Sequence, residues 1–291
     1  PSLREVVLFG GRDASGAVAD TWSWNGSRWQ QLQPATAPSP RMGHAMVTDF
    51  VRGGIMLFGG EVVESMFSGE SDETWVWHDG QWKLLFRAEM QPMRRAFSAM
   101  APFGNGVLMV SGGTFKFPDA WYWEGAFWRP SLPGPTMRFR HAMAYASPTS
   151  VVLFGGIGET SGPLDDTWVW DGDRWQQPVL MPRPGARHDH AMVYDAIRRY
   201  SIVVDGQGPS STLYDLWGFR FEREGAPEET CIAGEDGDAD SLPGCLDPDC
   251  WGLCNPHCPP GLDCDPAEPH CGDGTCNDWL EPGVCPKDCG S

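Results

Sequence analysis

The chain has 291 residues and a formal net charge of −18 at pH 7, with 39 acidic against 21 basic side chains. A chain of this length can bury a large core in one repeat domain and still carry a small appendage. No apolar run approaches the roughly 20 residues that span a bilayer, so we expect no membrane insertion. The negative charge also argues against nucleic acid as a partner.

Charge and cysteine content divide the sequence at the same place. Residues 1–226 hold 24 acidic and 20 basic side chains, whereas residues 227–291 hold 15 acidic side chains and one basic side chain. All ten cysteines lie between Cys231 and Cys289, where little apolar material is available for a core. Disulfides, metal ions or both must therefore hold the second part together. We predict two domains, 1–226 and 227–291, in a protein exported to an oxidising compartment.

The first domain repeats one phrase, which runs from Asp20 to Trp29 as Asp-Thr-Trp-Ser-Trp-Asn-Gly-Ser-Arg-Trp. Further copies begin at Glu73, Asp119 and Asp166, and a degraded copy begins at Asp215. The first Trp of successive copies is displaced by 53, 46, 47 and 49 residues. A period near 50 residues predicts an array of structural repeats.

Each repeat predicts four short strands. The first carries Arg-x-x-His-Ala-Met or a close variant, and the second is an apolar run that ends in two small residues, as in Ile55–Gly60. The third strand is Trp-x-Trp, and the fourth begins at the last Trp of the phrase. A run that is apolar throughout predicts a strand buried on both faces, and paired glycines permit positive φ or close backbone approach. Dipeptides such as Asn25-Gly26 and Asp79-Gly80 predict type I′ hairpin turns between the last two strands.

These motifs cover residues 1 to about 221 and resemble the kelch family. The resemblance implies an all-β chain with a kelch-type β-propeller of five or six four-stranded blades, followed by a small, disulfide-rich, loop-dominated domain. The chain departs from the family pattern at Ser98, which replaces His, at Asp205, which replaces the first Gly, and in a fifth copy without the final Trp.

Closure of the ring is left open by the strand count. We count 18 strands, two short of five complete blades. Residues upstream of Pro1, the stretch 221–229 or a neighbouring chain could supply the others. Because the chain begins without Met or a signal-like segment, we expect a mature or trimmed form with upstream residues missing.

The repeated polar residues favour structure over catalysis. Residues 1–226 contain no Cys, which excludes the Cys-crosslinked Tyr of copper-radical oxidases, and no sialidase box is present. The repeated arginines and the histidines His44, His141 and His190 occupy equivalent positions, so we interpret them as structural, with a metal site as the alternative for the histidines. His188 and Asp189 form an unusual polar cluster. We predict no enzymatic activity, and the alternative is a carbohydrate-active kelch enzyme of the isomerase or oxidoreductase type.

The variable loops are the predicted ligand-binding region. Loops between the second and third strands emerge on the same face as the connections between blades, and they include the long segments 61–72 and 114–118. Exposed apolar side chains on variable loops above a rigid scaffold are typical of recognition sites, although they can also fold back onto the blades. The candidates are Met66, Phe67, Phe115 and Phe117.

The acidic tail predicts bound calcium. Its first submodule, 231–264, has alternating aspartates followed by Cys-Leu-Asp-Pro-Asp-Cys, and it resembles the Asp-rich, Cys-paired repeats of secreted bacterial proteins. The second, 271–290, resembles Notch-type calcium modules. The candidate Ca²⁺ ligands are Asp236, Asp238, Asp240, Asp247, Asp249, Asp273, Asn277, Asp278, Glu281 and Asp288.

The even number of tail cysteines favours disulfides, although the connectivity stays open. Those cysteines are Cys231, Cys245, Cys250, Cys254, Cys258, Cys264, Cys271, Cys276, Cys285 and Cys289. Zinc bound by Cys250, Cys254, Cys258, His257 and His270 is one alternative, and a solvated, disordered tail is another.

Together these features predict a secreted or cell-surface binding protein. Its propeller loops would recognise a protein or a glycan, and its tail would be stiffened by Ca²⁺ and disulfides. A structural subunit that assembles with further copies of the chain is the remaining alternative.

Overall fold

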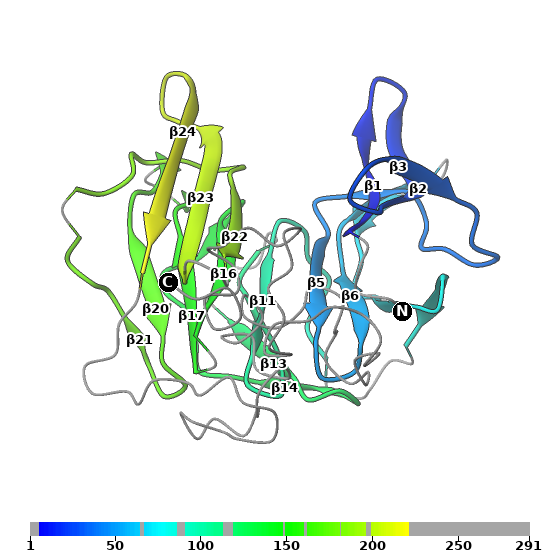
Figure 1. Cartoon of the computed structure of the whole chain (residues 1–291), viewed down its shortest axis with the longest axis horizontal. Helices are drawn as coiled ribbons and strands as arrows, with labels where there is room; N and C mark the ends of the chain where they lie inside the picture. Colours follow the sequence, from blue (N-terminus) through cyan, green and yellow to red (C-terminus); the bar gives the residue numbers. More distant parts are fainter. Residues whose placement is uncertain are drawn as a thin grey trace, which may run out of the picture.

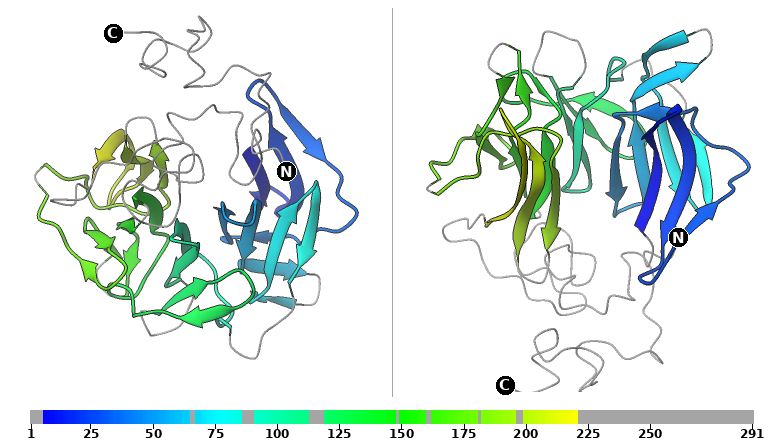
Figure 2. Two further views of the ribbon diagram at one scale, coloured as in Figure 1. Left: turned by 60° about the horizontal axis from the view of Figure 1, so that its bottom comes forward. Right: turned by 90° about the horizontal axis from the view of Figure 1, so that it is seen from above.

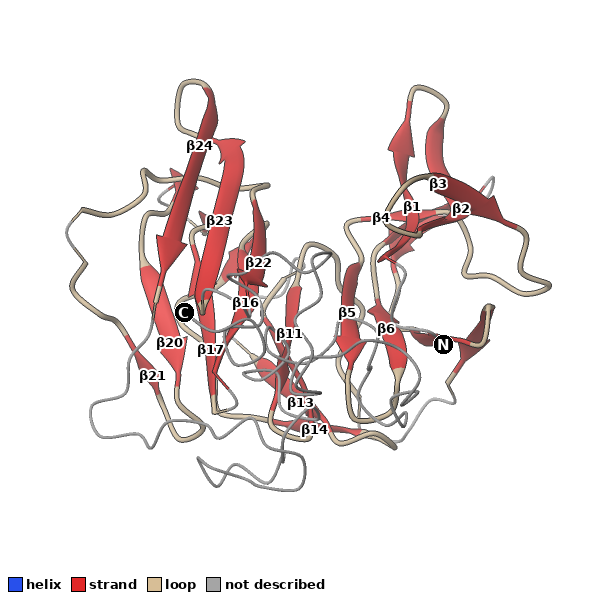
Figure 3. Ribbon diagram, in the orientation of Figure 1, coloured by secondary structure: helices blue, strands red, loops and turns tan. Residues whose placement is uncertain are grey.

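A computed structural model describes residues 6–220 apart from 65–66, 86–90, 113–118, 148, 160–161, 181 and 196–198. The described residues form 24 strands and no helix, which confirms the expected all-β class (Figures 1 and 3). None of these residues therefore provides a helix that could cross a membrane. The predicted calcium and disulfide residues of the tail lie outside the described residues.

Five antiparallel sheets carry the repeats. The first sheet contains β1 (Val6–Asp13), β2 (Gly16–Trp24) and β3 (Trp29–Leu32). The second contains β5 (Ala45–Asp49), β6 (Gly54–Phe58), β9 (Thr74–His78) and β10 (Gln81–Leu84). The third contains β11 (Ala99–Phe103), β12 (Gly106–Val110), β13 (Ala120–Trp123) and β14 (Trp128–Pro130). The fourth contains β16 (Ala142–Ser147), β17 (Ser150–Phe154), β20 (Thr167–Trp170) and β21 (Trp175–Gln176). The fifth contains β22 (Ala191–Asp195), β23 (Tyr200–Gln207) and β24 (Thr212–Phe219).

These sheets contain the 18 strands expected from the sequence. The order within the complete third sheet is β11-β12-β13-β14, so the chain moves steadily from the inner to the outer strand. The first sheet lacks the inner strand of this pattern, and the fifth sheet lacks the outer strand. Figure 2 shows the five sheets following one another along an arc, with β1–β3 and β22–β24 at its two ends. This arrangement is compatible with a β-propeller, and closure of a ring stays a prediction.

Two smaller sheets flank the arc. One joins β4 (Arg41–Met42), β7 (Glu61–Glu64) and β8 (Phe67–Glu70), and the other joins β15 (Arg138–Phe139), β18 (Ile157–Gly158) and β19 (Gly162–Pro163). The expectation of an irregular segment at 61–72 was therefore wrong in part. The backbone there forms the hairpin β7–β8, whose ladder with β4 satisfies its hydrogen-bonding groups.

The hydrophobic core lies between neighbouring sheets. Each sheet has a forward face, toward the next sheet along the chain, and a backward face, toward the preceding one. Phe9 of the first sheet packs with Leu57, Trp77 and Trp82 of the second, and three further clusters join the remaining neighbours in the same way. Each sheet alone is too small to bury its faces, so the fold depends on stacking.

The backbone at the diglycine positions behaves as the sequence predicted. Gly59 and Gly60 have φ values of 69° and 97°, and the Gly60 N–H donates to the Arg95 carbonyl at 2.9 Å. A Cβ on Gly59 would lie 2.4 Å from that carbonyl oxygen, so the close approach requires glycine. This hydrogen bond links the second sheet to the chain entering the third.

The hairpin turns follow the prediction only once. Asp79 and Gly80 both have positive φ, as a two-residue type I′ turn requires. At Asn25-Gly26 only the glycine has positive φ, and four residues separate Trp24 from Trp29. The Asn25 side chain accepts hydrogen bonds from the N–H groups of Ser27 and Arg28, so an Asx-type turn replaces the shorter one.

Candidate functional site

The repeated arginines are structural, as expected. Arg138 is 1% exposed, and its guanidinium donates two hydrogen bonds to the Asp166 carboxylate at 2.7 and 2.8 Å and one to the Gly155 carbonyl at 3.0 Å. The same carboxylate accepts the indole N–H of Trp168 at 2.7 Å. The arrangement recurs in four sheets as Arg41–Glu73, Arg95–Asp119, Arg138–Asp166 and Arg187–Asp215.

These pairs shift the pKa values of their carboxyl groups. Burial alone would raise the pKa of Asp166, but the hydrogen bonds and charge of Arg138 hold it below its ordinary value. The hydrogen bond from Arg187 lowers the pKa of Asp215 to about 2. Because each guanidinium is bonded to a carboxylate of its own repeat, none of the four can act as a free anion-binding arginine.

The repeated histidines are neutral at physiological pH; His141 and His190 are buried, and His44 is half-buried. Burial lowers the pKa of His141 to about 3 and the pKa values of His44 and His190 to about 4. The His141 ring faces the Val110 carbonyl of the preceding sheet, but its nitrogens form no well-aligned hydrogen bond. Within the described part of the chain, the rings of His141 and His190 are therefore buried without a hydrogen-bond partner at either nitrogen. No group of three metal-ligating side chains occurs among the described residues.

The last Trp of the phrase joins neighbouring sheets in the second, third and fourth sheets. The indole N–H of Trp82 donates to the Thr21 hydroxyl of the first sheet at 3.0 Å, and Trp128 donates to Thr74 of the second at 3.0 Å. The third sheet has Ala120 at this position, and the indole nitrogen of Trp175 is buried without a partner. The Thr of the phrase is therefore the acceptor for the Trp of the following sheet.

The third residue of each Arg-x-x-His motif forms a distinct row before the inner strands. Its members, Gly43, Phe97, Arg140 and Asp189, all have positive φ, between 53° and 63°. We call them the αL row. A non-glycine residue in this conformation costs roughly 1–3 kcal/mol, and such strain clusters at functional sites. The side chain at this position differs in every copy.

Backbone hydrogen bonds connect the αL row across four sheets. The N–H of Phe97 donates to the Gly43 carbonyl at 2.6 Å, that of Arg140 to Phe97 at 3.0 Å, and that of Asp189 to Arg140 at 3.1 Å. The side chains of the row also contact one another in the same order. A Cβ on Gly43 would lie 2.6 Å from the Phe97 ring, so that ring covers the glycine.

Charged side chains continue these contacts along the αL row. The Arg140 guanidinium lies 4.3 Å from the centroid of the Phe97 ring, and it donates to the Asp189 carboxylate at 2.7 Å. The His188 ring nitrogen lies 2.8 Å from the same carboxylate. Side chains of Arg140 and Asp189 are 34% and 37% exposed, so solvent or a ligand can reach both. The polar cluster noted at His188 and Asp189 is thus the end of an aromatic–cation–anion series.

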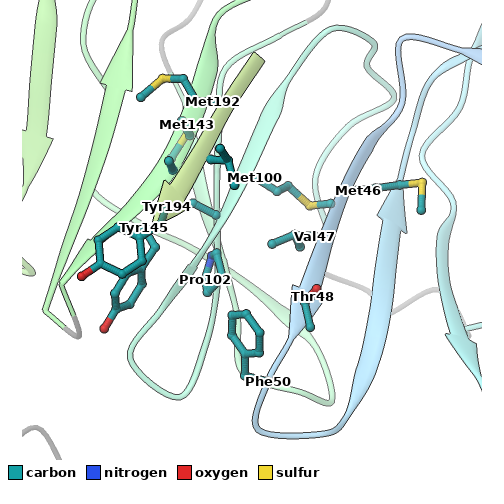
Figure 4. Close-up of a pocket in the computed structure, with 13 residues that line it drawn as sticks. Met46, Val47, Thr48, Phe50, Met100, Pro102, Met143, Tyr145, Met192 and Tyr194 are labelled. Atoms are coloured by element: carbon teal, nitrogen blue, oxygen red, sulfur yellow. The ribbon is translucent and has the colours of Figure 1, made fainter. Parts of the chain in front are cut away.

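The second feature is a cavity between the inner strands of four sheets. This cavity of about 370 Å³ opens among β5, β11, β16 and β22, and Figure 4 shows the side chains around it. Most of them are apolar, including Met100, Met143 and Pro102. The rings of Tyr145 and Tyr194 meet edge to face, with centroids 4.8 Å apart. This cavity is suited to apolar groups, and its lining contains no Asp, Glu, His, Lys or Arg.

The side chains of the loop residues predicted to bind a ligand are outside what the structure describes. Met66, Phe115 and Phe117 lie outside the described residues. Phe67 begins β8, but its side chain is not among those described. Sequence reasoning missed the αL row because Phe and Arg rarely adopt positive φ, so nothing in their identity predicts this conformation. The available signal was that one position inside a regular motif carried Gly, Phe, Arg and Asp.

Known proteins resemble the chain over more than half of its length. No protein-family model matches it. An F-box/kelch-repeat protein of Arabidopsis thaliana is 32% identical over 198 residues, which cover 57% of this chain and 39% of the relative. A tRNA wybutosine-synthesizing protein 4 of Emericella nidulans is 24% identical, over 69% of this chain and 16% of the relative. The human multiple epidermal growth factor-like domains protein 8 is 25% identical, over 72% of this chain and 6% of the relative.

The similarity to the plant protein supports a kelch-repeat assignment for the repeat region. The five sheets and their repeated phrase agree with that assignment. The chain spans well under half the length of each of these relatives, so it corresponds to a part of them.

Proposed function

We propose that the chain is a non-enzymatic binding protein whose αL row contacts a protein partner. The observation that carries this proposal is the strained conformation of Phe97, Arg140 and Asp189 at one repeated position. Glycine would adopt that conformation without strain, and Gly43 shows that the position accepts it. Side chains with a backbone cost are best explained by a use outside the fold.

The chemistry of the row suits a protein surface. Aromatic and Arg side chains dominate the energetics of protein interfaces, and partly exposed charged pairs supply specificity. Phe97, Arg140 and Asp189 offer these three kinds of contact in a fixed order. The kelch-repeat similarity supports the same role, since a repeat scaffold commonly presents variable residues to a partner.

Two arginines provide a matched test of this proposal. Arg140 and Arg199 both have positive φ, 58° and 54°, but Arg140 precedes the inner strand β16, whereas Arg199 lies in the turn between β22 and β23 at the opposite end of the inner strands. Replacing either with Gly relieves the positive-φ strain but gives the unfolded chain more freedom, and Arg140→Gly also removes the contacts with Phe97 and Asp189. We therefore expect each variant to fold with a free energy of unfolding within about 1 kcal/mol of that of the natural protein.

Displayed peptides selected on the purified protein would serve as the binding probe. Arg140→Gly should weaken their binding about tenfold or more, whereas Arg199→Gly should leave it unchanged. Equal binding by all three proteins, measured by biolayer interferometry, would contradict the proposal. An array of glycans tested with the same proteins decides whether a sugar takes the place of the peptide.

We further propose that the tail binds Ca²⁺ and that the protein is secreted or displayed at the cell surface. The clustered aspartates and ten cysteines of residues 231–289 support both parts. With a dissociation constant near 1 mM, typical of extracellular calcium modules, 10 mM Ca²⁺ should add about 1.4 kcal/mol to the stability of the tail, and EDTA should reverse it. Calorimetry of the oxidised protein with and without Ca²⁺ checks this, and an unchanged thermogram would contradict it.

A further inference from the structure

The two ends of the arc expose apolar sheet faces. On the backward face of the first sheet, Val6, Leu8 and Trp29 are 60%, 45% and 46% exposed. On the forward face of the fifth sheet, Val193 and Leu216 are 55% and 67% exposed. Exposed apolar surface of this extent on adjacent strands is typical of an interaction site.

One of these exposed faces is a backward face and the other is a forward face. Within each sheet, side chains alternate between the faces, so Val7 and Phe9 point forward from β1 while Val6 and Leu8 point backward. In the fifth sheet, Val204 and Leu216 are register partners at the positions that point forward in every other sheet. Each contact inside the arc joins one forward face to one backward face, and within the part of the chain that the structure describes one face of each kind is left free.

The contact between the third and fourth sheets shows how these free faces would fit. The forward face of the third sheet presents the register pair Val110 and Ala120. Trp175 of the fourth sheet packs against the hydrophobic cluster that contains this pair. The pair Val204 and Leu216 occupies the same positions in the fifth sheet. Trp29, paired with Trp24 as Trp175 is with Trp170, is the corresponding aromatic residue of the first sheet.

A polar mismatch does not prevent this fit. Two contacts inside the arc include an indole-to-Thr hydrogen bond, but the contact made by Trp175 forms without one. Leu216 would likewise leave the Trp29 indole without a hydroxyl acceptor. The free forward face thus resembles an internal face that already holds a Trp.

We propose that the two free faces bind each other between copies of this chain. The backward face of the first sheet in one copy packs against the forward face of the fifth sheet in another. The two patches differ, so the contact is heterologous, and repeated contacts produce a closed ring of copies or an open filament. The proposal does not depend on the αL row, which lies before the inner strands rather than on the end faces.

Two charge substitutions test this head-to-tail contact in the full chain. Leu216→Lys places a charge on the forward face and Leu8→Lys places one on the backward face. Both residues are well exposed, so each variant should fold, and Val193→Lys and Val6→Lys replace any variant that does not. Sedimentation velocity of the natural protein should show assemblies that grow with concentration, and each variant alone should associate about 30-fold more weakly or not at all.

Mixing the two variants gives the decisive measurement. Leu216→Lys retains an intact backward face and Leu8→Lys retains an intact forward face, so together they should form a heterodimer and nothing larger. Natural protein that stays monomeric at every concentration would overturn the proposal. So would a mixture that stays monomeric while the natural protein dimerises, because that result indicates a symmetric contact.

Val179→Lys serves as the matched control. Val179 is 96% exposed and lies in the connection between the fourth and fifth sheets, away from both end faces. It changes an apolar residue that is more exposed than Leu216 or Leu8 to the same charge. Assembly of this variant should match that of the natural protein. If Val179→Lys weakens assembly as much as Leu216→Lys does, the loss comes from added surface charge in general and not from the end faces.

Discussion

Trp29 and Trp82 occupy the same position of the repeated phrase, yet Trp29 is 46% exposed and Trp82 is 2% exposed. The difference lies in their neighbours. Trp82 packs against Phe9 of the preceding sheet and donates to Thr21, whereas the first sheet has no preceding sheet among the described residues. One motif therefore produces core inside the arc and exposed surface at its ends.

The paired carboxylates show the same contrast. Asp166 is bonded to a buried arginine and to the indole of Trp168. Asp20, at the equivalent position of the first sheet, accepts the indole N–H of Trp22 but has no arginine partner among the described residues. The interior of the arc thus completes interactions that its first sheet leaves unfinished, and this comparison can be tested position by position.

Removal of an interior arginine should have the largest effect. Arg138→Ala leaves the Asp166 carboxylate partly buried without its counter-charge, so we expect the free energy of unfolding to fall by about 3–5 kcal/mol. Arg174→Ala, which removes a 76% exposed side chain from a surface pair, should change it by less than about 0.5 kcal/mol. Urea denaturation measures both. Similar small losses in the two variants would show that the interior pairs do not stabilise the arc.

The second largest effect should be a loss of stability at acidic pH that comes from the repeated histidines. Their pKa values fall to about 3 and 4 in the folded protein, so unfolding lets the rings take up protons below pH 6.5. Stability should therefore decline as the pH falls from about 6.5 toward 4. The paired Asp215, with its pKa lowered to about 2, loses its contribution only between about pH 4 and pH 2.

His190→Ser tests the source of this decline. The third sheet already carries a serine, Ser98, at the equivalent position, so the substitution matches an existing repeat. The slope of the unfolding free energy against pH measures the number of protons taken up on unfolding. With three such histidines in the natural protein, we expect the variant to lose roughly a third of their contribution to this slope between about pH 5 and pH 6. Urea melts at several pH values give the slope, and an unchanged slope would exclude His190 as a contributor.

The smallest expected effect concerns the threonines of the phrase. Thr74→Val removes the acceptor for Trp128 and should cost about 1 kcal/mol. Thr167→Val should cost almost nothing, because no described residue donates a hydrogen bond to Thr167 and the fifth sheet has no strand that carries the Trp. The same denaturation experiment compares them. An equal cost at both positions would show that burial, rather than the indole bond, sets the contribution of this residue.

Much of the architecture could be predicted from the sequence because the repeat states it several times. The apolar runs before each diglycine and the Trp-x-Trp segments predicted the middle strands, and the 18-strand count was confirmed. The structural role of the arginines was also confirmed, but their carboxylate partners lie 24 to 32 residues away and could not be assigned from spacing.

The candidate site was harder to predict. Positive φ at Phe97 and Arg140 arises from hydrogen bonds across neighbouring sheets, and these contacts have no local signature. The hairpin β7–β8 was missed because its pairing with β4 compensates for a segment without clear alternation. Periodic, local features were therefore accessible, whereas features created by contact between repeats were not.

The hydrogen bond from the Gly60 N–H to the Arg95 carbonyl has a consequence for how the chain can evolve. It joins neighbouring sheets through main-chain atoms alone, as does the series of bonds along Gly43, Phe97, Arg140 and Asp189. These bonds between sheets use no side-chain atom of Phe97, Arg140 or Asp189, whereas Gly43 is held to glycine by the Phe97 ring. If the αL row binds a partner as proposed, single substitutions at Phe97, Arg140 or Asp189 can change specificity while these main-chain bonds stay in place.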